Sequence, residues 1–97
     1  MSNKHLPVYV TLLTTPQCGY CEDAKTILAK LAQEYPIVVE VVELRSPAGE
    51  QLALQGGVLF PPGLLLNGAP FSYGRVSERK LRRELARRCA LSERVAM

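Results

Sequence analysis

The chain has 97 residues, of which 47% are hydrophobic and 22% are charged, and its formal net charge is +3. This length suits one domain, expected to span residues 1–97 with a core over about 8–88, and the composition excludes collagen, coiled-coil and disordered classes. The polar N-terminus and the short apolar run after it resemble neither a signal peptide nor a membrane span. We therefore expect a cytoplasmic protein without a membrane partner.

The charge is unevenly distributed along the chain. Residues 1–74 carry four Lys/Arg and six Asp/Glu, whereas residues 75–97 carry eight and three. The C-terminal segment is thus expected to be a basic element on a mildly acidic body. Such an element is most often a solvated helix face, and a docking surface for an acidic partner is the alternative. No aromatic residues interleave with its basic ones, so we expect no nucleic-acid partner.

The first half of the chain predicts a strand, a helix and a second strand. Val8–Leu13 is nearly all apolar, as in a central strand buried on both faces, and Pro16 ends this strand. Apolar residues recur at three- and four-residue steps over residues 18–35, which predicts an amphipathic helix that stops at Pro36. Ile37–Leu44 is predicted as a second buried strand. The two strands should be parallel, with a right-handed crossover.

The second half begins with signals for a short helix and a hairpin. Ser46-Pro47 is typical of a helix start, and this helix should end at Gly56-Gly57. Asn67-Gly68 predicts a two-residue hairpin turn between two strands. The returning strand, Ala69–Tyr73, contains Pro70, which favours a position at the edge of the sheet.

A final helix should follow, capped by Ser77. Leu81, Leu85 and Cys89 recur at four-residue spacing and form its apolar stripe. Cys89 is therefore interpreted as a small hydrophobic residue and not as a third redox centre. The expected order is β-α-β-α-β-β-α, with a four-stranded mixed sheet flanked by helices.

Cys18 and Cys21 lie where the first strand gives way to the first helix. Unpaired N–H groups and the dipole at a helix N-terminus stabilise a thiolate at Cys18, and the thiolate is the attacking species. Cys21, one turn later, can attack a mixed disulfide formed at Cys18. The spacing therefore predicts a dithiol–disulfide oxidoreductase with Cys18 as the nucleophile and Cys21 as the resolving thiol.

A zinc site is the competing interpretation of the Cys18/Cys21 pair. Zinc sites usually bring a second pair of ligands, and the only other candidates here are Cys89 and His5. We therefore expect no metal and no cofactor. Three cysteines, an odd number, are also too few for a secreted disulfide scaffold.

Residues 14–21, Thr-Thr-Pro-Gln-Cys-Gly-Tyr-Cys, resemble the active-site stretch of glutaredoxins, with Gly19 where most dithiol members carry proline. Residues 62–68 resemble the stretch that holds the family's cis-proline. Over roughly residues 8–88 the chain is similar to a glutaredoxin-like member of the thioredoxin-fold family. The resemblance implies an α/β thioredoxin fold and a cis bond before Pro62. It also implies that the substrate is contacted by Gly19, Tyr20, Pro61, Pro62 and Gly74.

The chain departs from the glutaredoxin pattern in two places. Glutaredoxins hold glutathione partly with an acidic pair at the start of the last helix, and those positions read Val76-Ser77 here. We therefore expect weak glutathione binding, and the segment from Gly74 to Leu81 looks more like the thioredoxin version of this corner. The residue before the cis-proline normally exchanges hydrogen bonds with the substrate. Pro61 has no N–H, so one of these hydrogen bonds should be missing.

The leading hypothesis is a monomeric enzyme that reduces protein or small-molecule disulfides and is recharged by a reductase or by glutathione. An iron–sulfur cluster carrier is one alternative, because some glutaredoxins with glycine after the first cysteine bridge a cluster with glutathione as co-ligand. Gly19 permits this alternative, and Val76-Ser77 argues against it. The other alternative is a redox-inactive adaptor that docks through the basic C-terminal helix.

Overall fold

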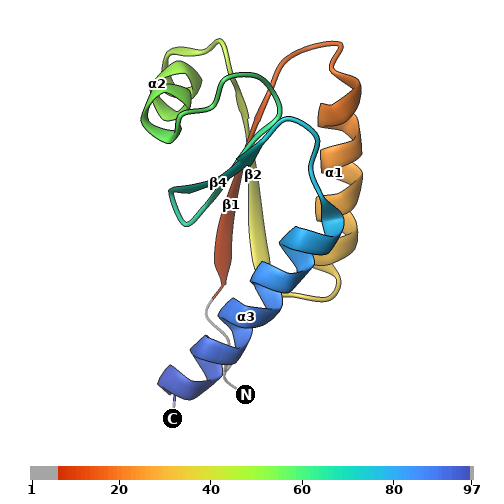
Figure 1. The fold of residues 1–97 in the computed structure, drawn as a ribbon, viewed down its shortest axis with the longest axis vertical. Coiled ribbons are helices and arrows are strands. Elements are labelled where there is room, and N and C mark those ends of the chain that lie inside the picture. The colour runs from red at the N-terminus through yellow and green to blue at the C-terminus, as the bar shows by residue number, and fades with distance from the viewer. Residues whose placement is uncertain (1–6, 97) are drawn as a thin grey trace.

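The computed structural model describes the backbone of residues 7–96 and the side chains of residues 7–90 (Figure 1). Its elements follow the predicted order: β1 (Val8–Thr14), α1 (Gly19–Ala32), β2 (Ile37–Glu43), α2 (Pro47–Gly56), β3 (Gly63–Leu66), β4 (Ala69–Tyr73) and α3 (Glu78–Ala96). Within these residues the strands form a four-stranded sheet of order β2-β1-β3-β4. β1 runs parallel to β2 and antiparallel to β3, and β3 and β4 are antiparallel. The expected mixed α/β architecture is confirmed.

The central strand β1 separates two buried layers, because successive side chains of a strand point to opposite faces. Val8, Val10 and Leu12 belong to a cluster that includes apolar residues of α1, β3 and α3. Leu13 points to the other face, where it is fully buried near Val58, in the loop that follows α2. Figure 1 accordingly shows α1 and α3 on one side of the sheet and α2 on the other.

The prediction that the second strand is buried is wrong. β2 lies at the edge of the sheet, with β1 as its one hydrogen-bonded neighbour among the described strands. Val38 and Val41 are 49% and 50% exposed. A continuous apolar run is compatible with an edge strand as well as a central one, and periodicity alone does not separate the two. The strand also ends at Glu43, one residue earlier than predicted.

The signals at element ends were more reliable. Ser46 caps α2, with its Oγ accepting the N–H of Gly49 at 3.0 Å, and Gly57 ends this helix with a φ of 68°. Asn67 and Gly68 form the hairpin turn, with φ values of 51° and 83°. The edge position expected for the strand that carries proline is confirmed for β4. The first helix, in contrast, ends at Ala32, before the predicted boundary.

The last helix is joined to the first by ion pairs as well as by apolar contacts. Leu81 and Leu85 are fully buried in the core, whereas Cys89, farther along the predicted apolar stripe, is half-buried. Ser77 caps the helix, as predicted, with its Oγ accepting the N–H of Lys80 at 3.2 Å. Among the described residues, no helix has the length and apolar character needed to cross a membrane.

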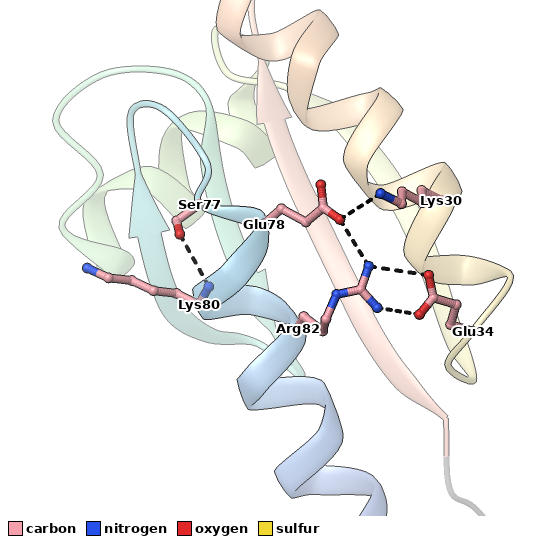
Figure 2. Close-up of polar contacts among 6 residues, drawn as sticks. All are labelled: Lys30, Glu34, Ser77, Glu78, Lys80 and Arg82. Atoms are coloured by element: carbon pink, nitrogen blue, oxygen red, sulfur yellow. Dashed lines mark hydrogen bonds and ion pairs between the residues drawn. The ribbon is translucent and has the colours of Figure 1, made fainter.

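Arg82 is the centre of these ion pairs (Figure 2). Its guanidinium donates to both carboxylate oxygens of Glu34, in the turn after α1, and to Glu78 at 3.0 Å. Glu78 is also paired with Lys30 at 3.1 Å. The hydrogen bonds from Arg82 lower the pKa of both carboxyl groups, because they stabilise the ionised forms. Part of the arginine content of α3 therefore serves to hold the helix against α1.

Gly49 provides a test of how closely α2 approaches the sheet. A Cβ added at this buried glycine would lie 1.9 Å from the carbonyl oxygen of Glu43, so backbone would have to move. We expect Gly49→Ala to lower the free energy of unfolding by about 1–3 kcal/mol. Urea denaturation should show a lower midpoint at unchanged slope. Gly19→Ala is the matched control, because an added Cβ there meets no atom within 4 Å.

Arg82→Gln tests the ion pairs between α1 and α3. We expect a melting temperature at pH 7 lower than that of the wild type by a few degrees, on the order expected for a partly exposed network. The pKa values of Glu34 and Glu78 are lowered from 4.5 in the folded protein, so their stabilising effect is present above that value. It is lost as the pH falls through the lower folded values.

The difference in melting temperature between wild type and Arg82→Gln should therefore shrink when the comparison is repeated near pH 3. Arg79→Gln is the control, since Arg79 forms no ion pair with any residue that the structure describes. A difference that stays constant between pH 7 and pH 3 would show that Arg82 stabilises the protein by packing alone.

Candidate active site

Cys18 and Cys21 are joined by a disulfide, with their Cα atoms 5.1 Å apart. The pair lies at the junction of β1 and α1, as the sequence predicted. β1 ends at Thr14, and the loop that follows contains Gln17 with a φ of 57°. Cys18 is the N-cap of α1, so the helix begins one residue after the position expected from the periodicity.

The two sulfur atoms lie in different environments. Cys18 is partly exposed, whereas Cys21 is 1% exposed. The Sγ of Cys18 accepts the backbone N–H of Cys21 at 3.1 Å, and the carbonyl oxygen of Cys18 accepts the N–H of Glu22 at 3.2 Å. A sulfur anion at this N-cap would therefore be stabilised by an N–H group and by the helix dipole.

The Pro61–Pro62 bond is cis, as the resemblance implied. Pro62 is buried, and its carbonyl oxygen accepts the N–H of Gly74 at 2.8 Å. The next residue, Gly63, pairs with Leu13 of β1 on one side and with Tyr73 of β4 on the other. These pairings place the loop before β3 and the loop after β4 at the same end of the sheet as the cysteines (Figure 1). Pro61 is half-buried and, lacking an N–H, offers only its carbonyl oxygen.

Exposed apolar side chains border these loops, and sequence reasoning had identified only Tyr20 among them. Tyr20 is 53% exposed, and Leu59 and Phe60, directly before the two prolines, are 75% and 55% exposed. Phe60 packs edge-on against Tyr73, with 5.0 Å between the ring centroids. In the sequence, the signal for these exposed side chains is Leu59-Phe60, two large apolar residues directly before the two prolines. A surface loop does not need such residues for its own stability.

Gly74 is required by this aromatic pair. Its φ is 79°, in the left-handed region that favours glycine, and a Cβ at this position would lie 2.9 Å from the Cε1 of Phe60. The absence of a side chain at Gly74 thus lets the loop after β4 pass under the Phe60 ring while its N–H reaches Pro62.

The corner that would carry an acidic pair in glutaredoxins is occupied differently. Val76 is 6% exposed and belongs to the core, and the hydroxyl of Ser77 serves as the cap of α3. A cavity of about 700 Å³ lies beside this corner, between α1 and the start of α3. Asp23 and Glu78 both line it, and the Glu78 carboxylate is engaged by Lys30 and Arg82.

The residues considered for zinc do not form a cluster in the part of the chain that the structure describes. No group of three or more His, Cys, Asp or Glu side chains there lies close enough to hold a metal ion. Cys89 lies on α3 and His5 lies outside the described residues.

Comparison with known proteins assigns the chain to a family. A family model described as "Glutaredoxin-like domain (DUF836)" matches residues 9–86. The chain belongs to this glutaredoxin-like family. Among curated proteins, a thioredoxin of Methanocaldococcus jannaschii is 33% identical over 61 residues, which is 63% of this chain and 72% of the relative. A probable thioredoxin of Archaeoglobus fulgidus is 29% identical over 75 residues, 77% of this chain and 82% of the relative.

Solved structures confirm the thioredoxin fold. A mutant thioredoxin from Halobacterium salinarum superposes with a TM-score of 0.68 at 21% identity, covering 84% of this chain and 74% of that one. A malarial protein gives a TM-score of 0.65 at 24% identity, covering 86% and 98%. Together with the Cys18–Cys21 pair, the curated relatives of this glutaredoxin-like protein support thiol–disulfide oxidoreductase chemistry.

Proposed function

We propose that this glutaredoxin-like protein reduces protein or small-molecule disulfides through Cys18 and Cys21. The observation that carries the proposal is the asymmetry of the pair. Cys18 is the partly exposed member, and it accepts an N–H at the start of a helix, whereas Cys21 is buried behind it. The first is suited to attack a substrate and the second to resolve the product.

The reaction begins from the dithiol form of the protein. The Cys18 thiolate attacks one sulfur of the substrate disulfide, forming a mixed disulfide while the substrate S–S bond breaks and the other substrate sulfur leaves as a thiolate. Cys21 then loses its proton to solvent and attacks the Sγ of Cys18. This step forms the Cys18–Cys21 disulfide and releases the second substrate thiolate. Two electrons pass from the protein to the substrate, and a reductase or glutathione returns them.

The residues around the exposed sulfur would position the substrate. Gly19 leaves open space beside Cys18, because even an added Cβ would meet no atom within 4 Å. Tyr20 supplies an exposed ring. Gly74 lies in the loop after β4, where its N–H donates to the carbonyl oxygen of Pro62. Pro61 and Pro62 would present backbone to the substrate. A bound peptide could donate a hydrogen bond to the Pro61 carbonyl oxygen, but Pro61 has no N–H to donate in return.

The proposed setting is a reducing compartment, the cytoplasm, with the protein acting as a monomer. Thiol pools in such a compartment keep an exchanging cysteine pair reduced between turnovers, which a reductase of disulfides requires.

Single-cysteine variants test the roles of the two thiols. With Cys89→Ser in every protein, so that only the pair is probed, we expect Cys21→Ser to trap mixed disulfides with an oxidised peptide. The Cys18 thiol in this variant should react with iodoacetamide at pH 7 at least about tenfold faster than the Cys21 thiol in Cys18→Ser. The reason is that Cys18 combines exposure with a stabilised thiolate. Mass spectrometry of timed samples measures both reactions.

The Cys18→Ser variant serves as the control for trapping, because it should form no lasting adduct. Faster alkylation of Cys21 than of Cys18 would reverse the assignment of nucleophile and resolving thiol. A wild-type protein that fails to reduce any disulfide from its dithiol form would contradict the proposed function as a whole.

Glutathione is expected to bind weakly, because the start of α3 presents Val76 and a capping Ser77 in place of two acidic groups. Wild-type protein should cleave the mixed disulfide of a peptide with glutathione no more than about threefold faster than the mixed disulfide of the same peptide with β-mercaptoethanol. A rate difference of this size corresponds to the contribution of one exposed ion pair. Ser77→Asp keeps a capping side chain and adds a carboxylate, so it should raise this ratio. Chromatography of samples quenched at timed intervals measures the released peptide and gives both rates. A strong wild-type preference for the glutathionylated peptide would contradict the prediction.

A further inference from the structure

The cations of residues 75–88 fall into two sets. In the first set, Arg82 pairs with Glu34 and Glu78. Arg87 and Arg88 both pair with Glu84, at 2.6 Å and 2.7 Å. The second set consists of side chains that form no ion pair with any residue the structure describes: Arg75, Arg79, Lys80 and Arg83. Figure 2 shows the difference directly, with Arg82 turned toward α1 and Lys80 extending away from it.

Three members of the second set line one cavity of about 460 Å³ between β4 and α3, which we call the β4–α3 cavity. These are Arg75, Lys80 and Arg83. The strand side of the cavity is formed by Phe71, Ser72 and Tyr73. It therefore combines three cations with two aromatic side chains, and none of the three is ion-paired with a carboxylate that the structure describes.

Glu84 is the one acidic residue that lines the β4–α3 cavity. Its carboxylate is already held by Arg87 and Arg88, which lower its pKa and keep it ionised. Those two arginines offset its charge, so the cavity remains positive overall. A ligand entering it would meet Lys80 and Arg83 as unoccupied donors.

Backbone pairing connects the β4–α3 cavity to the proline loop. Tyr73 pairs with Gly63, and the N–H of Gly74 binds the carbonyl oxygen of Pro62 at 2.8 Å. Arg75 is the next residue along the chain. The cavity thus starts beside the proline loop, at the same end of the sheet as Cys18 and Cys21.

We infer that the β4–α3 cavity binds aspartate and glutamate side chains of the polypeptide that carries the disulfide. The inference rests on the proposed function and adds a substrate preference to it: disulfides flanked by acidic residues. An extended peptide advances about 3.3 Å per residue, so a carboxylate four positions from the substrate cysteine can lie about 13 Å away from it. Separate cations along the cavity match separate carboxylates on such a peptide, and complementary charge raises the rate of productive encounter.

Two disulfide-bonded peptides test the inference on the full chain. They share one sequence, except that three residues starting three positions after the cysteine are glutamate in one peptide and glutamine in the other. At low salt, the reduced wild-type protein should reduce the glutamate peptide about fivefold faster, as expected for one or two exposed charge pairs. The preference should fall toward one in 0.5 M NaCl, because exposed charges are screened.

Lys80→Gln and Arg83→Gln should each lower the preference about twofold and leave the rate with the glutamine peptide unchanged. Arg45→Gln is the matched control. It removes one cation near the same end of the sheet, since the neighbouring Leu44 N–H binds the Thr14 carbonyl oxygen, but next to β2 at the opposite edge. The preference should be unaffected in this variant.

Equal, efficient reduction of both peptides at low salt would overturn the inference and leave the proposed function intact. An Arg45→Gln variant that loses as much preference as Arg83→Gln would also overturn it, because net charge and not the cavity would then be responsible. Failure to reduce either peptide would overturn the proposed function, and the inference with it.

Discussion

The position of the redox pair depends on β1, which is paired along both of its edges. Its aliphatic residues are buried in two layers, and its partners β2 and β3 fix its register from both sides. Because these pairings hold β1 in place, the loop after Thr14 brings Cys18 to a fixed position at the start of α1. Gly63 pairs with Leu13 in the same frame, so the proline loop is brought to that end of the sheet as well. Cys18 thereby caps α1 at this fixed place, since its sulfur accepts the N–H of Cys21 in the first turn of the helix.

The parts of the fold that were predictable are those with a local cause. Asn67 and Gly68 adopt positive φ because asparagine tolerates that region and glycine has no Cβ to oppose it. Ser46 caps a helix because its hydroxyl reaches a nearby N–H. These effects act over two to four residues, so the sequence displays them. The exposure of β2 has a distant cause, namely which helices cover which part of the sheet. An apolar run such as Ile37–Leu44 carries no information on that coverage, and the burial predicted for it was wrong.

The candidate site divides in the same way. Cys18, Cys21 and the cis bond at Pro62 follow from motifs, through local spacing or family resemblance, and the structure places them at one end of the sheet. The contact between Phe60 and Tyr73 requires the β3–β4 pairing, which brings the end of β4 beside the loop before β3. Gly74 was expected to contact substrate, but its role under the Phe60 ring is visible only in three dimensions. Composition likewise showed that α3 is basic without showing which cations are already paired.

The pairing of those cations follows from helix geometry. Side chains three and four residues apart share a face of a helix, so Glu78 and Arg82 project together toward α1. Lys80 and Arg83 are rotated away from that face and meet β4 instead. The same helix can therefore be held in place through one row of charges while the other row stays available for a ligand. Because the two rows share no partner, the charges facing β4 can change without loosening the contact between α3 and α1.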